Sequence, residues 1–256
     1  MAHNYDPLFF DYIERGARSS ARKFSRHLIE MLGVKSVLDV GCGRGIWLSE
    51  WLATGVAKVQ GVDGAYVEAT SLAIPGESFR ATDITELFDL KRQFDLVQCL
   101  EVGEHVAPDR SGTLVDNIVR HGRVVLFSAA TPGQGGEFHI NEQEFSFWRE
   151  LFLRHDYHPF DYIRPLLVDD GEVEPWYRYN ALLYIHSGSI PSLPPTVAAT
   201  RIPEGSSIPD VAPLGWKLRC AVLRCLPVSM VTRLSVILHR VVVMRSRRDL
   251  ASSTSK

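Results

Sequence analysis

Two carboxylates and an imidazole lie within five residues of each other in the stretch CLEVGEHVAP, residues 99–108. Side chains three and four positions apart share one face of a helix, so a helical turn here would bring Glu101, Glu104 and His105 together. Such a group can hold a metal ion, exchange protons with a substrate, or only cap a solvated turn. The surrounding elements decide which chemistry is available.

A second group of candidate residues lies upstream, where Gly41, Gly43 and Gly45 follow the apolar run VLDV. Small residues between a strand and a helix let the backbone approach a ligand, and the helix N-terminus offers unpaired N–H groups. Asp63 follows in GVDG, about twenty residues later, where a carboxylate can accept hydrogen bonds from ribose hydroxyls. Asp83 occupies the same kind of position after a third run, SFRATDIT.

These groups need a sheet to position them, and the chain has the pattern of one. Short β-type runs alternate with helical stretches, and residues 8–32 have helical spacing of apolar residues. This alternation predicts an α/β fold, a doubly wound and mostly parallel sheet with helices on both faces. Ligands bind outside the carboxyl ends of such strands. The expected strands lie in SVLDV, VAKVQGVDG, SFRATDIT, FDLVQCL and RVVLFSAA, with HPFDYIRPLLV and YNALLYIHS as edge strands.

Bulk composition excludes several classes of protein. Of the 256 residues, 45% are hydrophobic and 23% charged, as in ordinary globular domains. A net charge of −2 supplies no global field for nucleic acid, so no nucleic-acid partner is expected. The four cysteines form no CxxC pair, and Cys42 and Cys99 are expected to be buried thiols of a reducing compartment. The N-terminus lacks the apolar region of a signal peptide, so cytoplasmic residence is expected.

The motifs VLDVGCGRG, GVDG, TDI and FDLVQCLEVGEH resemble, in order and spacing, those of class I S-adenosylmethionine-dependent methyltransferases over about residues 36–128. The resemblance implies a Rossmann-like sheet, S-adenosylmethionine as cofactor, a ribose contact at Asp63 and an adenine contact at Asp83 and Ile84. Asp39 either contacts the cofactor or orders the loop. The NAD fingerprint GxGxxG fits less well, because the chain has GxGxG. The cofactor-binding set implied by the resemblance is Asp39, Gly41, Gly43, Asp63, Gly64, Asp83, Ile84 and Glu101.

The EVGEH segment also resembles the metal-binding segment of ubiquinone-pathway O-methyltransferases and of the 2′-O-methyltransferases that act on small-RNA ends. In the latter a second histidine beyond the fifth strand completes the site, and His139 has the corresponding place. The resemblance implies a divalent metal at Glu101, Glu104, His105 and His139, with Mg²⁺ or Mn²⁺ ahead of Zn²⁺ or Fe²⁺, which would activate a bound hydroxyl. Alternatively His105 or His139 acts as a base without metal, or Glu104 and His105 only cap the turn. Glu104, His105 and His139 are therefore the expected catalytic residues.

The segment after the fifth run, ATPGQGGEFHINEQEFSFW, combines glycines with a polar cluster and indicates a substrate loop. Together with the DYIRPLLVDDGEVEPWYRYNALLY segment it resembles bacterial methyltransferases found with glycan and natural-product genes. We therefore expect an O-methyltransferase acting on a small-molecule or glycan acceptor, a sugar, glycan or polyol-type natural product. The alternatives are a metal-independent N- or C-methyltransferase with a histidine base, an RNA methyltransferase, and a non-catalytic cofactor-fold binding module. The catalytic part has no evident basic stripe, which disfavours RNA.

Three regions are expected. Residues 1–187 form the methyltransferase domain, residues 188–214 a linker or extended arm rich in Pro, Ser and Gly, and residues 215–256 a basic, apolar helical tail that Pro227 divides. No apolar run approaches the ~20 residues that span a bilayer. The tail is suited either to peripheral contact with the inner face of the membrane or to packing against the main domain or a second subunit of a homo-oligomer.

Overall fold

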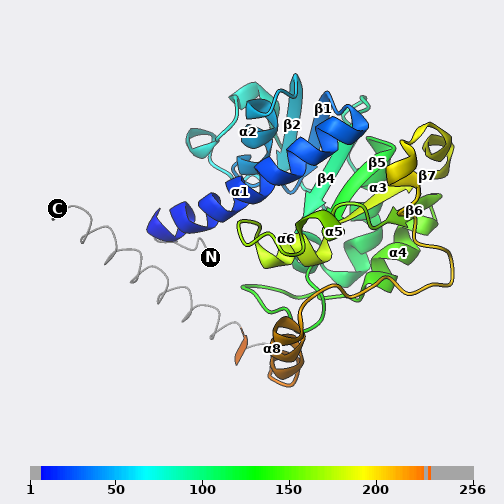
Figure 1. The fold of residues 1–256 in the computed structure, drawn as a ribbon. Helices are drawn as coiled ribbons and strands as arrows, with labels where there is room; N and C mark the ends of the chain where they lie inside the picture. The colour runs from blue at the N-terminus through cyan, green and yellow to red at the C-terminus, as the bar shows by residue number, and fades with distance from the viewer. Residues whose placement is uncertain (1–6, 228–229, 232–256) are drawn as a thin grey trace, which may run out of the picture.

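One sheet of seven strands organises the part of the chain that can be described, in the order β3-β2-β1-β4-β5-β7-β6 (Figure 1). The computed structural model describes residues 7–227 and 230–231. All neighbouring strands run parallel except β7, which is antiparallel to both β5 and β6. The strands are β1 Ser36–Val40, β2 Lys58–Asp63, β3 Phe79–Ala81, β4 Leu96–Leu100, β5 Val124–Ser128, β6 Tyr157–Phe160 and β7 Leu182–His186.

Helices cover both faces of this sheet, as the alternation of runs predicted. The described α-helices are α1 Pro7–Leu32, α2 Ile46–Ala53, α3 Ser111–Arg120, α4 Phe145–Leu153, α5 Arg164–Leu167, α6 Pro175–Asn180, α7 Pro195–Ala198 and α8 Leu214–Arg224. The short 3₁₀ helices are η1 Ala69–Ser71, η2 Gly76–Ser78, η3 Gly103–His105, η4 Pro108–Arg110 and η5 Ser187–Ser192. None of the described helices has the length and apolar character needed to cross a membrane.

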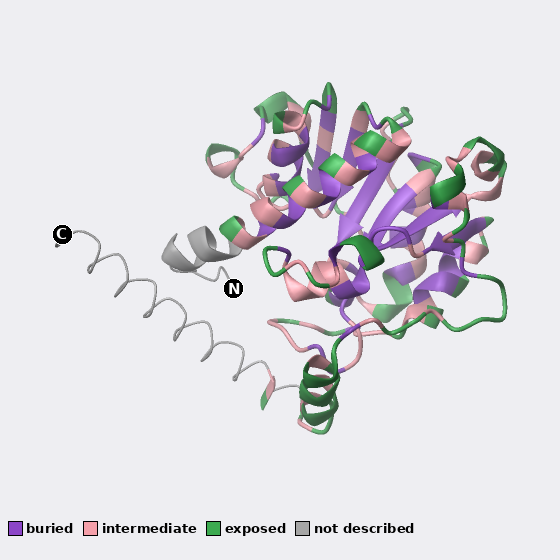
Figure 2. Ribbon diagram, viewed as in Figure 1, coloured by how far each residue is buried: buried purple, intermediate pink, exposed green. Residues whose placement is uncertain are grey.

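Successive strand residues face opposite sides of the sheet, which divides the core into two clusters. Val37 and Leu96 pack with α1 and α2, whereas Leu38 and Val97 pack with α3 and α4. Because both faces are covered, the strands are almost wholly buried except at the edge strand β3 (Figure 2). The predicted doubly wound sheet is confirmed.

The two last strands differ in part from the prediction. Both HPFDYIRPLLV and YNALLYIHS contain a strand, but β7 lies between β5 and β6 and is therefore interior. Only β6 forms the edge on this side. The expectation of two edge strands is wrong for β7, because apolar runs of similar length carry no information about their spatial order.

The segment predicted as a linker packs against the domain along β6. The Ile202 N–H donates to Pro159 O at 2.9 Å, and the Asp161 N–H donates to Thr200 O at 2.9 Å. Val197 and Ile202 are buried in the two core clusters. Its Pro and Ser content limits regular structure but does not prevent burial of these apolar residues. Beyond it, α8 ends at Arg224, before Pro227, and the second helix predicted for the tail lies outside the described residues apart from 230–231.

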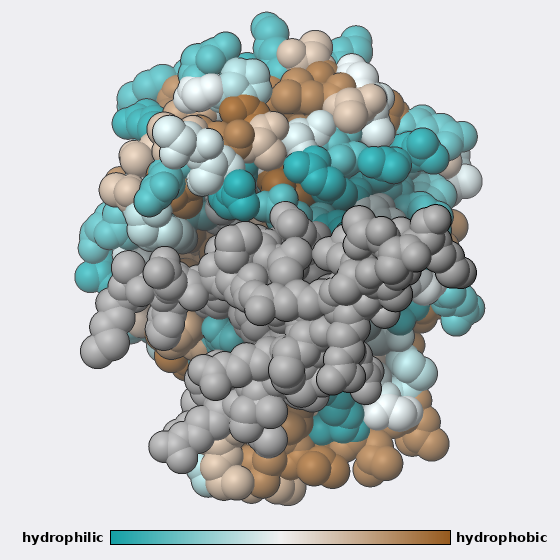
Figure 3. Space-filling model, turned by 90° about the vertical axis from the view of Figure 1, so that its left-hand side faces the viewer, coloured by the Kyte–Doolittle hydropathy of each residue, from teal (hydrophilic) through white to brown (hydrophobic). Residues whose placement is uncertain are grey.

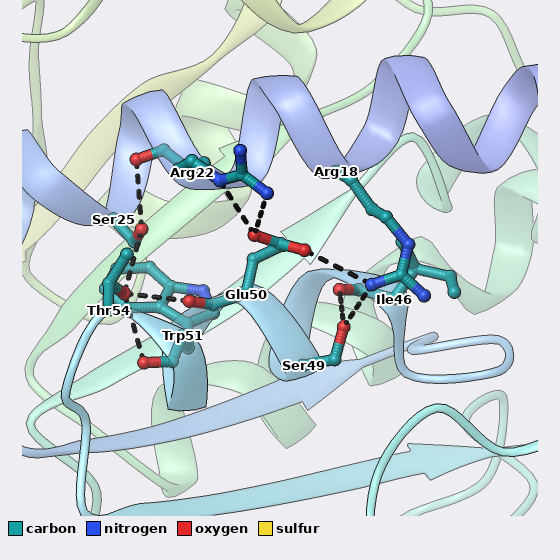
Figure 4. Close-up of polar contacts among 8 residues, drawn as sticks. All are labelled: Arg18, Arg22, Ser25, Ile46, Ser49, Glu50, Trp51 and Thr54. Carbon is teal, nitrogen blue, oxygen red and sulfur yellow. Dashed lines mark hydrogen bonds and ion pairs between the residues drawn. The ribbon is translucent and has the colours of Figure 1, made fainter.

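Charged side chains join α1 to α2 next to the glycine loop (Figure 4). Glu50 is buried, and its carboxylate accepts hydrogen bonds from Arg18 Nη1 at 3.2 Å and from Arg22 Nε at 3.1 Å. Arg18 also donates to Ser49 Oγ at 2.9 Å. Each arginine keeps part of its side chain in water, so solvent screening reduces the strength of these pairs.

Replacing Glu50 by Gln should reduce the free energy of unfolding by about 1–2 kcal/mol, because the buried carboxylate has charge-assisted hydrogen bonds that an amide cannot reproduce. Urea unfolding followed by circular dichroism measures the change. Glu30→Gln, at an exposed position of α1, is the control and should have little effect. Equal stability of the two variants would contradict a stabilising role for this α1–α2 contact.

Candidate active site

A cavity of about 730 Å³ opens at the carboxyl ends of β1, β2, β3 and β4, within the size range of small-molecule sites. It lies where the fold predicts a ligand, because the loops after these four parallel strands meet at one edge of the sheet. Most of the predicted cofactor-binding residues line it, namely Gly41, Gly43, Asp63, Gly64, Asp83, Ile84 and Glu101.

The loop between β1 and α2 requires glycine for two reasons. Gly41 and Gly45 have φ angles of 84° and 77°, a region that residues with a Cβ rarely adopt. A Cβ on Gly41 would also lie 2.5 Å from the Val102 side chain, and one on Gly45 would lie 2.9 Å from Ile74. Neither Gly41 nor Gly45 can therefore be replaced by a residue with a side chain without a change in the loop.

Asp63 holds this loop in place from the end of β2. Its Oδ2 accepts the Gly43 N–H at 2.6 Å, and its Oδ1 accepts the Gly64 N–H at 2.7 Å. The Tyr66 hydroxyl donates to the same Oδ1, although the Tyr66 side chain is otherwise exposed. Oδ2 thus bonds the glycine loop, whereas Oδ1 bonds the Gly64 N–H and the Tyr66 hydroxyl.

Asp39 does not belong to the wall of the cavity. Burial raises the pKa of Asp39 to about 7, opposed by a hydrogen bond from the Gln98 amide. A buried carboxyl beneath the glycine loop favours the loop-ordering role over direct contact with the cofactor.

The third predicted acid, Asp83, lies at the cavity edge and caps its own turn. Its Oδ1 accepts from the Thr85 N–H at 2.9 Å and from Thr85 Oγ1 at 2.6 Å, and these bonds lower the pKa of Asp83. The next carbonyl oxygen, Ile84 O, accepts from Asn117 Nδ2 at 3.1 Å. The turn that presents Ile84 to the cavity is therefore fixed from α3.

Glu101 follows β4 in a strained backbone conformation, with a φ angle of 55°. Its N–H donates to Ser128 O on β5 at 3.0 Å. Its carboxylate accepts from Gln134 Nε2 at 2.7 Å and from Asn180 Nδ2 at 3.5 Å, and Asn180 also donates to Gln134 Oε1 at 2.7 Å. Burial raises the pKa of Glu101, whereas these amides and Ser128 lower it.

Glu104 occupies the centre of η3 and is almost completely buried. Among the described residues, neither of its carboxylate oxygens has a hydrogen-bond partner of ordinary geometry. Burial raises the pKa of Glu104 well above its usual value, and the neighbouring charge of Glu101 adds to this. Its backbone carbonyl oxygen accepts the N–H groups of Ile140 and Asn141, at 2.9 Å and 3.0 Å.

Those two backbone bonds bring His139 to η3. The rings of His105 and His139 lie 5.0 Å apart, nearly perpendicular. One possible ligand atom from each of Glu104, His105 and His139 lies within 4.8 Å of the other two. Three of the four predicted metal ligands thus converge, whereas Glu101 is not part of this group and instead bonds Gln134 and Asn180.

A carboxylate orients His139 from behind. Glu142 Oε1 lies 2.8 Å from His139 Nδ1, and the two Glu142 oxygens accept the N–H groups of Gly133 and Gly135 at 2.7 Å and 2.8 Å. A proton on Nδ1 shared with Glu142 leaves Nε2 as the nitrogen with a free lone pair. The backbone N–H groups of Gly133 and Gly135 thus fix the Glu142 carboxylate, which in turn fixes the orientation of the His139 ring.

Buried packing fixes the turn that carries Glu104 and His105. Asn141 Nδ2 donates to Gly103 O at 3.1 Å and to Ser111 Oγ at 2.9 Å. A Cβ on Gly103 would lie 2.6 Å from the Trp148 ring, so α4 rests directly on this backbone. The site is therefore held by η3, the loop after β5 and α4 together.

Sequence reasoning assigned no site role to Gln134 and no specific partner to Glu142. In the sequence, Glu142 is only one of several polar residues that follow His139. No sequence pattern connects Gln134 with Glu101, 33 residues away, or with Asn180, 46 residues away. Arg164, in the DYIRPLLVDDGEVEPWYRYNALLY segment, is fully buried and forms two hydrogen bonds of 2.7 Å each with the Asp161 carboxylate. It supports the fold and does not face an acceptor.

Comparisons with known proteins agree with this geometry. The family described as "Methyltransferase domain" matches residues 2–163. The ubiquinone biosynthesis O-methyltransferase of Bradyrhizobium diazoefficiens is 36% identical over 115 residues, which cover 41% of this chain and 42% of that protein. The protein of the same name from Bordetella parapertussis is 36% identical over 135 residues, covering 49% and 50%. The chain thus spans about half the length of the curated relatives it matches.

Solved structures share the fold at low identity. The sugar N-methyltransferase KedS8 from Streptoalloteichus has a TM-score of 0.56 at 15% identity, covering 73% of this chain and 95% of that one. Streptomyces venezuelae DesVI has a TM-score of 0.56 at 14% identity, covering 72% and 100%. With its strand order, its cavity at the strand ends and a family match over more than half its length, the chain belongs to the methyltransferase-domain family.

Proposed function

We propose that the protein is an S-adenosylmethionine-dependent O-methyltransferase acting on a hydroxyl of a sugar, glycan or polyol-type natural product, with a divalent metal ion held by Glu104, His105 and His139. The observation that carries the proposal is the Glu104 carboxyl, which is buried beside two imidazoles with no hydrogen-bond partner among the described residues. A buried carboxylate without a partner is strongly unfavourable, so a cation or a proton must compensate its charge.

The donor set fits a cation. One carboxylate and two imidazoles suit Mn²⁺, Fe²⁺ or Zn²⁺, and the imidazole content makes Mn²⁺ a better fit than Mg²⁺. Glu142 supports His139 in the way that carboxylates support histidine ligands in metal sites. Glu101 would join the set only by leaving Gln134 and Asn180, so we assign it to the wall shared by cofactor and acceptor.

The chain's own residues supply alignment and proton control. S-adenosylmethionine brings a methyl group on a good leaving group, and a divalent ion in this place lowers the pKa of a nearby hydroxyl. The glycine loop and Asp63 position the cofactor, while η3 and the loop after β5 close on the acceptor side. The residues around the acceptor must also hold its hydroxyl in line with the methyl group, because orientation supplies much of the rate acceleration.

Two further observations support the proposed class of acceptor. The curated relatives are named as O-methyltransferases, which favours an oxygen nucleophile. The loop after β5 presents polar side chains next to the three-residue group, as a polyhydroxylated acceptor requires. The likeness to a sugar methyltransferase structure concerns the fold alone.

Replacing His139 by Ala should reduce Mn²⁺ affinity by more than the roughly 10–100-fold that loss of a ligand's hydrogen-bond partner costs, because the variant loses one of three direct ligands. Methyl transfer to a panel of glycans and polyols should fall in parallel and should stop in wild-type enzyme treated with EDTA. Calorimetry with Mn²⁺ measures binding, and transfer of a labelled methyl group measures activity.

His155→Ala, which removes a partly exposed histidine paired with Asp116 away from the site, is the matched control. Activity that survives EDTA together with an intact rate in His139→Ala would reject the metal. Activity that survives EDTA but falls in His139→Ala would instead favour the second candidate, a metal-independent N- or C-methyltransferase, for which the His139–Glu142 pair is a suitable oriented base.

Replacing Asp63 by Asn should weaken S-adenosylmethionine binding by about tenfold or more, because an amide cannot accept hydrogen bonds through both of its polar atoms. Isothermal titration calorimetry on the full chain measures the affinity. Asp169→Asn, at an exposed position after α5, should bind like the wild type. Unchanged affinity in Asp63→Asn would remove the ribose role from this residue, and a wild type that fails to bind would favour a non-catalytic binding module.

A further inference from the structure

Helix α8 packs on the active-site loop through one of its faces. The Cys220 carbonyl oxygen passes so close to Gly133 that a Cβ there would lie 2.2 Å from it. Arg219 Nη1 donates to Gln134 O at 2.7 Å, and the Trp216 ring lies 5.5 Å from Tyr179. The helix therefore has a fixed orientation next to the loop that carries His139 (Figure 1).

The opposite face of α8 exposes a stripe of large apolar side chains. Leu214, Leu218 and Val222 are 82%, 65% and 56% exposed. Their spacing of four residues aligns them along one side of the helix. Figure 2 shows α8 as mostly exposed, and in Figure 3 hydrophobic residues gather at the lower edge of the molecule, where α8 lies in Figure 1. We call these three residues the α8 stripe.

The sequence from α8 onward has a charge opposite to that of the rest of the chain. Residues 214–256 contain nine Lys and Arg against one acidic residue, Asp249. Residues 1–213 contain 19 Lys and Arg against 29 Asp and Glu. The net charge of −2 thus conceals an acidic catalytic part and a strongly basic end.

We propose that helix α8 docks through the α8 stripe on the surface of an anionic lipid bilayer, to which the positive charge of the C-terminal sequence is complementary. Apolar side chains on one face of a helix enter the boundary between headgroups and acyl chains, and basic residues nearby are attracted to anionic headgroups. A protein partner of the stripe would not need the excess of positive charge, and a nucleic acid would not need exposed leucines. The combination selects a lipid surface.

This docking surface goes beyond the proposed function and does not depend on it. Because the inner face of α8 holds the loop that carries His139, docking would place that loop beside the bilayer. This consequence for the acceptor alone rests on the proposed function: a hydroxyl on a lipid-attached glycan would meet the site at the membrane surface.

Vesicle sedimentation of the full chain tests the proposal. Wild-type protein should bind vesicles of phosphatidylcholine with phosphatidylglycerol and bind much less to phosphatidylcholine alone, with binding that falls as salt increases. The triple variant Leu214→Gln, Leu218→Gln and Val222→Gln keeps the charge and should bind at least about tenfold less, because it loses the apolar contact.

Two controls separate this surface from general stickiness and from self-association. The double variant Leu87→Gln and Leu166→Gln changes exposed leucines elsewhere and should bind vesicles like the wild type. Light scattering without lipid should give the same molar mass for the wild type and the triple variant. No binding to anionic vesicles, undiminished binding by the triple variant, or a change of its oligomeric state would each overturn the proposal, the last by assigning the stripe to a second copy of this chain.

Discussion

The geometry of the site depends on Glu104, whose backbone and side chain have opposite roles. Its carbonyl oxygen ties two N–H groups of the loop after β5 to η3, which sets the separation of His105 and His139. Its carboxyl lies between the same elements, buried and without a partner among the described residues. Backbone hydrogen bonds thus provide the stability that a buried, unpaired carboxyl takes away. A cation or a proton must therefore compensate the charge of this carboxyl group.

The rest of the fold keeps that arrangement rigid. Parallel strands deliver Asp63, Asp83 and Glu101 to one edge, and α4 rests on Gly103 from the other side. The side-chain amides of Gln134 and Asn180 bond the Glu101 carboxylate. The result is two carboxyl groups, three residues apart, with different environments: Glu101 accepts from two side-chain amides, whereas Glu104 has no hydrogen-bond partner of ordinary geometry among the described residues.

The strand-end residues could be predicted because strand period and parallel connections leave little freedom in where Gly41, Asp63 and Asp83 emerge. The convergence of Glu104, His105 and His139 agrees with the resemblance that suggested it. The partners of Glu101 could not be predicted, because they depend on how two distant loops pack. The burial of Val197 and Ile202 could not be predicted either. A high content of proline and serine indicates a lack of regular secondary structure but says nothing about packing contacts.

The Tyr66 hydroxyl bonded to Asp63 has a consequence for how tightly a ligand can bind there. A ribose hydroxyl that reaches this oxygen replaces an existing donor and does not satisfy an empty acceptor. Binding at this point is an exchange of one hydroxyl for another, and its free energy is the difference between two similar bonds. The carboxylate therefore favours a ligand that presents a hydroxyl here over one that does not, since only a hydroxyl can take over the bond that the phenol makes.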